Sequence, residues 1–292
     1  MSAINIRTNW LLFLVMSIST AITAEPVLEI GVIADCQYDT RTSSIRKYDL
    51  STKKLQQAIT DFNHKDLSFV VHLGDFIDQG FDHFATLLSI TEWSRAPFFH
   101  VLGNHDFSVE DHQKLAVPTV LGMPSRYHSF VRNEFRFIIL DSNDISLYAY
   151  PADDTRTLTA RKYHSRYWSN KPEWNGAFGQ EQLSFVANEI KLAERLDQKV
   201  ILFSHHPVFP PNRHNAWNET ELITLLSSSS NVVMFINGHN HSGNYGQKNG
   251  IHFVTFKGMV DTTTTAYGIL RLYSNKAEIV GRGRQDSKTF IF

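Results

Sequence analysis

The sequence predicts an α/β domain in which two mixed β-sheets pack face to face and helices cover both outer faces, a four-layer α/β/β/α sandwich. In the first half of the chain, short apolar runs with the character of strands alternate with segments of helical periodicity. After residue 126 the pattern changes to pairs of strands joined by short turns. Strand-like runs also fill the C-terminal region. Two sheets with helices outside is the layout that fits these three observations.

Three segments have apolar residues at helical spacing. Residues 49–63 place Leu55 and Ile59 four positions apart on one face. Residues 179–195 repeat this pattern over a longer stretch, and residues 219–227 form a shorter candidate. We therefore expect three helices here, each with one face against a sheet.

Strands are predicted from apolar runs rich in β-branched and aromatic residues. Five such runs are LEIGVIA, LSFVVHL, APFFHVL, KVILF and NVVMFIN. The runs RYHSFV and FRFIILD flank Arg132-Asn133-Glu134, which indicates a hairpin. Three further strands are expected in IHFVTFKG, AYGILRLY and KAEIVGR.

Residues 142–180 are polar and aromatic and have only weak periodicity. A stretch of this length without regular structure inside a compact domain is usually functional or loosely ordered. We interpret it as an insertion on the substrate side of the molecule.

Composition limits the classes of partner. The net charge of −1 and the pI near 6.9 give no reason to expect a nucleic-acid surface. The apolar content of 42% suits a globular domain with a large core. No internal repeat or charged linker divides the chain, so residues 25–292 are expected to form one domain. The oligomeric state does not follow from the sequence.

The first 24 residues have the pattern of a secretory signal peptide. Arg7 precedes the apolar stretch from Trp10 to Met16, and small residues follow as far as Ala24. Cleavage after Ala21 or after Ala24 fits, and the alternative is an uncleaved anchor, although the apolar core is short for a transmembrane helix. We expect an exported protein, periplasmic or secreted, without stable membrane insertion after cleavage. The single cysteine cannot form an internal disulfide.

Short polar clusters follow the five apolar runs. They are Asp35-Cys36-Gln37, Gly74-Asp75, Gly103-Asn104-His105-Asp106, His205-His206-Pro207 and Gly238-His239-Asn240-His241. Side chains at strand ends gather on the loop face of a sheet, where ligands of open α/β proteins bind. Carboxylates, amides and imidazoles in this pattern indicate a two-metal site. Oxygen donors favour Mn or Mg over Zn.

The order and spacing of these clusters resemble the calcineurin-like metallophosphoesterase superfamily over nearly the whole chain after residue 24. That superfamily has the pattern Asp-x-His, Gly-Asp, Gly-Asn-His-Asp/Glu, His and Gly-His-x-His. Gln37 departs from it, because most members have histidine there. With GVIADCQY, NGAFGQEQL and GHNHSGNY, the chain resembles the branch of manganese-dependent ADP-ribose/CDP-alcohol diphosphatases.

The resemblance implies two divalent metal ions, with Mn favoured and Mg, Fe or Zn as alternatives. It implies one site formed by Asp35, Gln37, Asp75 and His241. The other site would be formed by Asp75, Asn104, His205 and His239, with Asp75 as the bridging ligand. Replacing a histidine nitrogen by the harder oxygen of Gln37 should loosen one site and bias it toward Mn.

Two residues are the candidates for catalysis. The resemblance implies that His105 points at the scissile phosphate, and Asp106 is expected to orient it as a general acid. An imidazole beside two cations should otherwise have a depressed pKa. Asp78 is either a hydrogen-bond partner of a ligand histidine or an acid at a helix start or on the surface.

Other polar residues are expected to be structural. Neighbouring residues of an extended segment face opposite ways, so only one of His205 and His206 should bind metal. The motif selects His205 and leaves His206 as a packed residue. Cys36 should face the core, and buried core histidines are expected at four further positions, His72, His100, His128 and His252.

We therefore expect a hydrolase for the phosphoanhydride of nucleotide-linked small molecules such as ADP-ribose and CDP-alcohols. The main alternative is a broad phosphodiesterase or phosphomonoesterase that also accepts cyclic nucleotides. A non-enzymatic alternative is a metal-stabilised binding or scaffold protein. A candidate at every ligand position, together with His105, argues against that reading.

Overall fold

The computed structural model describes residues 25–41 and 43–292. The predicted signal peptide, residues 1–24, lies outside the described residues. Within the described ranges, no helix is both long and apolar enough to cross a lipid bilayer.

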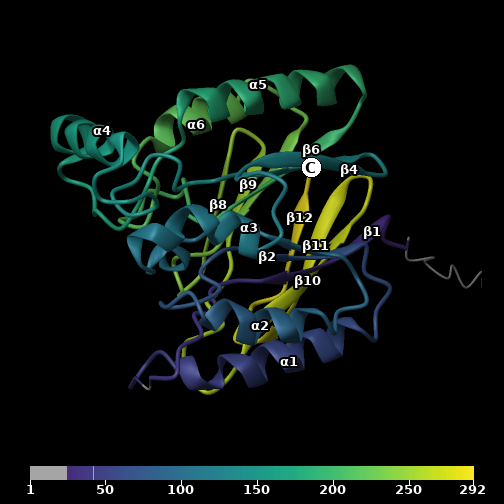
Figure 1. Ribbon diagram of the computed structural model, residues 1–292. Coiled ribbons are helices and arrows are strands. Elements are labelled where there is room, and N and C mark those ends of the chain that lie inside the picture. The colour runs from purple at the N-terminus through teal and green to yellow at the C-terminus, as the bar shows by residue number, and fades with distance from the viewer. Residues whose placement is uncertain (1–24, 42) are drawn as a thin grey trace, which may run out of the picture.

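Two six-stranded sheets form the centre of the molecule (Figure 1). In the first sheet the strand order is β12-β11-β10-β1-β2-β3. Strands β1, β2 and β3 are parallel to one another, while β10 pairs with β1 in the antiparallel direction. The bounds are β1 Leu28–Ile33, β2 Phe69–His72, β3 Phe98–His100, β10 Ala266–Leu272, β11 Lys276–Gly283 and β12 Lys288–Ile291.

The second sheet has the order β4-β5-β6-β7-β9-β8. Its inner strands β5, β6, β7 and β9 are parallel, and antiparallel strands form both edges. The β4–β5 hairpin turns at Asn133, which has a φ of 51°, as the polar break in the sequence predicts. The bounds are β4 His128–Arg132, β5 Phe135–Ile139, β6 Lys199–Ser204, β7 Val232–Asn237, β8 Asn244–Lys248 and β9 Ile251–Thr255.

Helices cover the outer face of each sheet (Figure 1). Helices α1, Ser51–Phe62, and α2, His83–Thr91, pack on the first sheet. Helices α5, Gln180–Arg195, and α6, Glu219–Leu226, pack on the second sheet. The predicted α/β/β/α layering and the three predicted helices are thus confirmed.

A core of apolar side chains joins the two sheets. Val32 and Phe69 from the first sheet lie in one cluster with Phe137, Phe203 and Met234 from the second. Phe69 packs edge-on against Phe137 with ring centroids 5.0 Å apart. Burial of aromatic side chains at this interface holds the two sheets together, and with them the two sets of strand ends.

The segment 142–180 is more regular than the sequence suggests. It contains α4, Thr155–Tyr163, followed by a π-helical turn, His164–Trp168. The Asp154 carboxylate accepts a hydrogen bond from the Arg156 N–H and caps α4. Only Thr157 and Ala160 of α4 are buried, which explains why no apolar period marks this helix.

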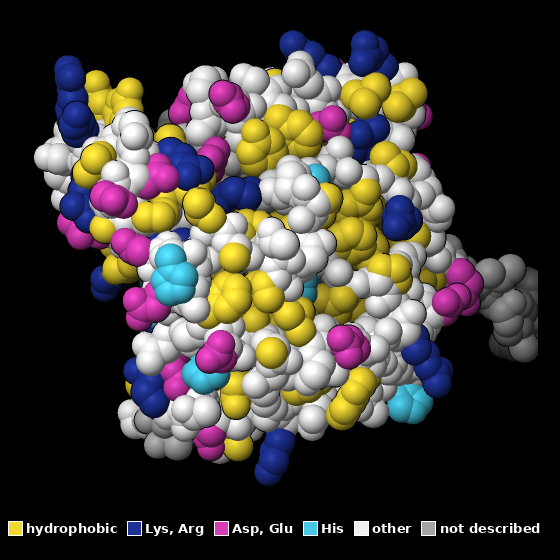
Figure 2. All heavy atoms as spheres, viewed as in Figure 1, with side chains coloured by type: hydrophobic (Ala, Val, Ile, Leu, Met, Phe, Trp, Pro, Cys, Tyr) yellow, Lys and Arg dark blue, Asp and Glu magenta, His cyan; other side chains and the backbone are white. Residues whose placement is uncertain are grey.

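The remaining short elements are also weak in sequence. Strands β8 and β12 lie at sheet edges, and of their residues only Phe290 is buried, so their apolar alternation is poor. Four further helical segments lie near the strand ends: η1 Tyr48–Leu50, η2 His105–Phe107, η3 Asp111–Ala116 and α3 Val117–Val120. On the face shown in Figure 2, acidic and basic side chains are interspersed around apolar patches.

The residues predicted to be structural lie in or against the core. Cys36 is buried with its Sγ 3.7 Å from Met259 Sδ. His72, His100 and His252 are buried, and His128 is half-buried.

Candidate metal centre

The ends of five strands bring the predicted ligands together between the two sheets. Strands β1, β2 and β3 supply polar residues from the first sheet, and β6 and β7 supply histidines from the second. The first-sheet residues are Asp35, Gln37, Asp75, Asn104 and His105, and the second-sheet residues are His205, His239 and His241. The structure therefore places all seven predicted ligands at one site, as the contacts below show.

Four of these residues have a left-handed backbone. The φ angles are 51° at Asp35, 44° at Gln37, 58° at Asp75 and 69° at His239. Residues other than glycine rarely adopt this conformation, and it persists where surrounding contacts enforce it. Here the Gln37 N–H donates to the Asp75 carbonyl at 2.8 Å. The turns point the side chains into the site instead of continuing the strands.

Asp106 holds these turns in place. Its Oδ2 accepts the N–H groups of Gly103 at 2.8 Å and Asp75 at 3.1 Å, and its Oδ1 accepts that of Phe76 at 2.8 Å. The carboxylate is fully buried and occupied by backbone donors. The expected pairing of Asp106 with His105 is therefore wrong in geometry, because the Asp106 side chain braces the backbone below the site.

One group of donors surrounds His205. Its Nδ1–H donates to the Leu73 carbonyl at 2.8 Å, which leaves the Nε2 lone pair directed at the site. This Nε2 lies 3.1 Å from Asn104 Oδ1, 3.3 Å from Asp75 Oδ1 and 3.1 Å from His239 Nδ1. Bonds of about 2.1 Å to one ion, at right angles, separate donor atoms by about 3 Å. The spacing is that of ligands to a common cation.

A second group contains Asp35, Asp75 and His241. One donor atom from each lies within 4.8 Å of the others. The His241 Nδ1–H donates to Asp261 Oδ1 at 2.9 Å, so its Nε2 faces Asp35 Oδ1 at 3.6 Å. Asp35 Oδ1 in turn accepts the backbone N–H of His239 at 3.1 Å. A carboxylate that accepts the second ring N–H of a ligand histidine, as Asp261 does for His241, is a common feature of metal sites.

Gln37 provides a test of whether a cation fits. Its Nε2 donates to Asp75 Oδ2 at 2.9 Å, and its Oε1 is buried without a hydrogen-bond partner among the described residues. A buried carbonyl oxygen without a partner costs about 1–3 kcal/mol. A divalent cation would satisfy this oxygen, so the residues present fit the predicted two-metal site.

The electrostatics agree with this fit. Burial alone lowers the pKa of His205, but the Asp75 carboxylate outweighs it and raises the pKa to about 9. At His241 burial again lowers the pKa, and Asp35 and Asp261 raise it to about 9. At these two histidines the neighbouring carboxylates thus stabilise positive charge, whereas burial and the nearby His206 and His205 lower the pKa of His239.

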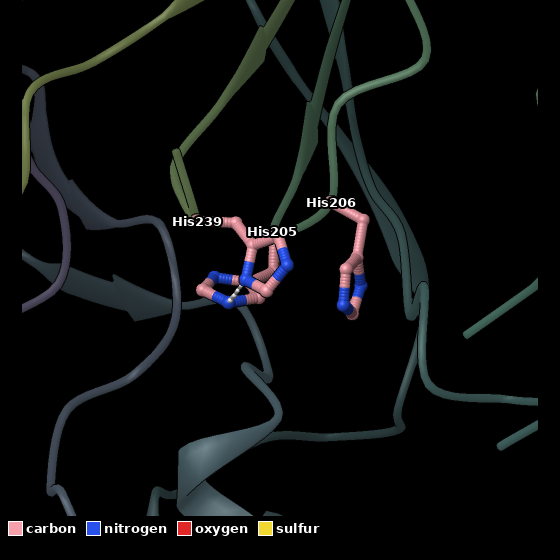
Figure 3. A group of neighbouring side chains, drawn as sticks. All are labelled: His205, His206 and His239. Carbon is pink, nitrogen blue, oxygen red and sulfur yellow. Dashed lines mark hydrogen bonds between the residues drawn. The ribbon is translucent and has the colours of Figure 1, made fainter. Parts of the chain in front are cut away.

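His206 lies beside this group but its nitrogens have other partners. Its Nδ1 is 2.7 Å from Ser142 Oγ and its Nε2 is 3.4 Å from the Trp174 carbonyl oxygen. Figure 3 shows the ring nitrogens of His205 and His239 facing each other, with the His206 ring standing apart. The contacts fit the expectation that His206 is a packed residue, although it is near enough to reach a shared ion with the other two histidines.

His105 is positioned by Asp78. Its Nδ1 lies 3.1 Å from Asp78 Oδ1 and 3.0 Å from the Asp78 carbonyl oxygen, and a quarter of its side chain is exposed. Burial lowers the pKa of His105, but Asp75 and Asp78 outweigh it, and the pKa is raised. Asp78 therefore takes the place expected of Asp106, and its histidine partner is not a metal ligand.

A cavity of about 290 Å³ is lined by His105 and by five of the predicted ligands, Gln37, Asp75, Asn104, His239 and His241. Arg46, Trp174 and His214 also line it. Sequence reasoning missed Arg46, His214 and Asp261 as site residues, since each lies in a loop without a motif. Asn175, which contacts His239, falls inside the NGAFGQEQL motif, but its contact could not be read from the sequence.

Comparison with known proteins agrees with the fold and the site. A mouse manganese-dependent ADP-ribose/CDP-alcohol diphosphatase is 28% identical, with 91% of this chain and 94% of the relative covered. An Arabidopsis thaliana protein of the same name is also 28% identical, with 91% and 97% covered. The crystal structure of a dimetal phosphatase from Danio rerio superposes with a TM-score of 0.83 at 24% identity, and covers 92% of this chain and 100% of that one.

The family match, the named relatives and the donor set at the strand ends identify a metal-dependent phosphohydrolase. Residues 28–243 match the sequence profile of the calcineurin-like phosphoesterase family. The chain belongs to this family, and the resemblance seen in the sequence is confirmed.

Proposed function

We propose that this protein is a manganese-dependent diphosphatase that hydrolyses the phosphoanhydride of nucleotide-linked small molecules such as ADP-ribose or CDP-alcohols. The observation that carries the proposal is the guanidinium of Arg46 in the same cavity as the metal ligands. A diphosphate carries two adjacent anionic groups. One can bind at the cations while Arg46 holds the other, and a phosphate monoester has no use for that second contact.

Arg46 is fixed for this role. Its backbone pairs with that of Asp261, and the Lys47 N–H donates to the Val260 carbonyl at 2.8 Å. The Arg46 Nη1 lies 4.0 Å from Asp78 Oδ1, and 39% of the side chain is exposed. The guanidinium is therefore charged, weakly paired and within reach of a ligand.

Trp174 supplies an aromatic surface on another side of the cavity. Its ring centroid lies 5.1 Å from that of His239 and 5.2 Å from that of His214. The Arg213 guanidinium lies 5.4 Å from the same ring. A nucleobase can stack on such a side chain without hydrogen bonds to the edges of the base. Stacking of this kind suits both adenine and cytosine nucleotides.

The reaction uses few protein groups. When bound, the two divalent cations neutralise phosphate charge and activate the attacking water. Asp35, Gln37, Asp75, Asn104, His205, His239 and His241 would hold them. Water forms a new P–O bond to one phosphorus and gives up a proton to solvent, the anhydride P–O bond breaks, and the other phosphate leaves.

His105 completes the reaction by donating a proton to the leaving phosphate oxygen. Asp78 occupies its Nδ1, so Nε2 is the nitrogen available to donate. The leaving phosphate is weakly basic, and its departure needs less help than the alkoxide of a monoester would.

The test is an activity panel with the Mn-loaded protein. ADP-ribose and CDP-choline should be turned over faster than p-nitrophenyl phosphate and bis-p-nitrophenyl phosphate. Arg46→Gln should raise the KM for ADP-ribose by at least about tenfold, with a smaller effect on p-nitrophenyl phosphate. Arg195→Gln is the control, since Arg195 is exposed at the end of α5 and does not line the cavity.

Faster turnover of simple esters by the wild-type protein would instead favour the broad phosphoesterase. A metal-loaded protein inactive on the whole panel would favour the scaffold alternative.

A further inference from the structure

Asn175 is buried beside the metal centre with its amide orientation fixed. Its Nδ2 donates to the Arg213 carbonyl at 2.8 Å and to the Asn215 carbonyl at 2.9 Å. Carbonyl oxygens accept only, so the NH₂ group must face them and Oδ1 must face the other way. That oxygen lies 3.0 Å from His239 Nε2.

This contact selects one tautomer of His239. Asn175 Oδ1 accepts only, so His239 must carry its proton on Nε2. The lone pair of a neutral imidazole then lies on Nδ1, which faces His205 Nε2 at 3.1 Å. With the proton on Nδ1 instead, the Nε2 lone pair of His239 would face a lone pair of Asn175 Oδ1 at 3.0 Å, and no ring lone pair would point toward the cation site.

We propose that Asn175 is a positioning residue of the metal centre, which holds His239 in the tautomer and orientation that present Nδ1 to one cation. The inference rests on the proposed binding of a cation by His239. It gives the segment 142–180 a second role beside substrate recognition.

The contacts around Asn175 hold its backbone in one position beside His239. Gly176 follows it, and a Cβ at Gly176 would lie 2.3 Å from the Ser142 carbonyl oxygen, so only glycine fits there. The backbone N–H of Trp217 donates to the Gly176 carbonyl at 2.8 Å. Ser142, at the other end of the segment 142–180, places its Oγ 2.7 Å from His206 Nδ1. Both ends of the segment thus brace histidines of the second sheet.

One consequence concerns deletion of this segment. Removing residues 142–180 would remove both Ser142 and Asn175, so metal would be lost as well as substrate contacts. Point variants therefore give the clean test.

The test compares Asn175→Leu, Asn175→Asp and the control Asn215→Ala in Mn titrations followed by electron paramagnetic resonance of free Mn²⁺. Asn175→Leu removes the acceptor, and we expect one of the two ions to bind about 10- to 100-fold more weakly. Asn175→Asp keeps the oxygen that faces His239 but sets its second oxygen against the Arg213 and Asn215 carbonyls, so its Mn affinity should fall between those of the wild type and Asn175→Leu. Asn215→Ala keeps the backbone carbonyl that accepts from Asn175 and loses only the side-chain hydrogen bond to the Pro210 carbonyl, so it should bind Mn like the wild type.

Two outcomes would overturn the proposal: wild-type Mn affinity in Asn175→Leu, or an equal loss in Asn215→Ala. A second measurement needs no variant. Long-range ¹H–¹⁵N spectra of the metal-free, ¹⁵N-histidine-labelled wild type should show His239 as the Nε2–H tautomer, and an Nδ1–H form would contradict the inference even if Asn175→Leu failed to fold. Neither measurement uses a substrate. The Mn affinities and the His239 tautomer therefore test the role of Asn175 even if the protein lacks the proposed diphosphatase activity.

Discussion

His105 and Asp78 form a contact pair at the mouth of the metal centre, with Nδ1 of the imidazole 3.1 Å from Oδ1 of the carboxylate. A charged partner on Nδ1 favours the imidazolium and leaves Nε2 as the proton donor. The pair therefore has the arrangement of a general acid and its orienting carboxylate.

Removing this carboxylate should change the pH dependence of turnover. Asp78 raises the pKa of His105. A general acid must be protonated to act, so Asp78→Asn should move the alkaline limb of the kcat profile to lower pH and reduce kcat. Asp39→Asn is the matched control, since Asp39 binds Arg41 but not His105. An unchanged alkaline limb in Asp78→Asn would remove Asp78 from this role.

Two substitutions should separate metal binding from proton transfer. Asp75→Ala should abolish turnover and lower the metal content, because both predicted sites lose a ligand. His105→Ala should keep its metal and lower the rate by a factor of about 10²–10⁴. Metal analysis of the purified variants by mass spectrometry makes the comparison, and a metal-free His105→Ala protein would contradict the assignment.

Gln37 should influence which metal binds. Gln37→His replaces an oxygen donor by a softer nitrogen and restores the residue usual in the superfamily. We expect this variant to bind Zn better relative to Mn than the wild type does. Competition between Mn and Zn at equal free concentrations, followed by metal analysis, measures the ratio. If that ratio stayed the same, the Gln37 carbonyl would not be a ligand.

His100 should make the fold sensitive to acid. Burial lowers its pKa to about 3, below the value of about 6.5 expected in the unfolded chain. Between these values the unfolded state binds a proton that the folded state does not, so stability falls as the pH drops below about 6.5. The loss approaches about 1.4 kcal/mol per pH unit and ends near the folded pKa.

Urea denaturation at several pH values tests this prediction. His100 packs against Phe76 with ring centroids 4.8 Å apart, so His100→Phe keeps an aromatic side chain in an aromatic environment. The variant should lose less stability than the wild type between about pH 6 and 4. Parallel curves for the two proteins would show that acid acts elsewhere.

We also propose that the protein is exported, on the strength of the N-terminal sequence. The mature chain is expected to begin between Ile22 and Glu25. N-terminal sequencing of protein recovered from the periplasm or medium of a bacterial host measures this directly. Membrane-bound material with an intact Met1 would favour an anchor.

The convergence of the predicted metal donors at one place could be anticipated from the sequence. Each donor follows an apolar strand, and parallel strands in a sheet must end at the same edge, so the residues after them are forced together. The same logic gave the layered fold, because a strand buried on both faces and a helix with one apolar face can be recognised locally. Helix α4 and the edge strands β8 and β12 were not predicted, because few of their residues are buried and they lack an apolar period.

Only the tertiary structure decided how the side chains around the donors pair. His105 could meet Asp78 or Asp106, and the choice depended on the turn that directs Asp106 to the backbone N–H groups of Gly103, Asp75 and Phe76. The contact of Asn175 with His239 joins residues 64 positions apart, from segments with no periodic pattern. Which segments form strands, and which of their residues are buried, follows from local composition. The direction of a loop side chain depends instead on left-handed backbone turns and on distant carbonyl groups. Those exist only once both sheets have packed.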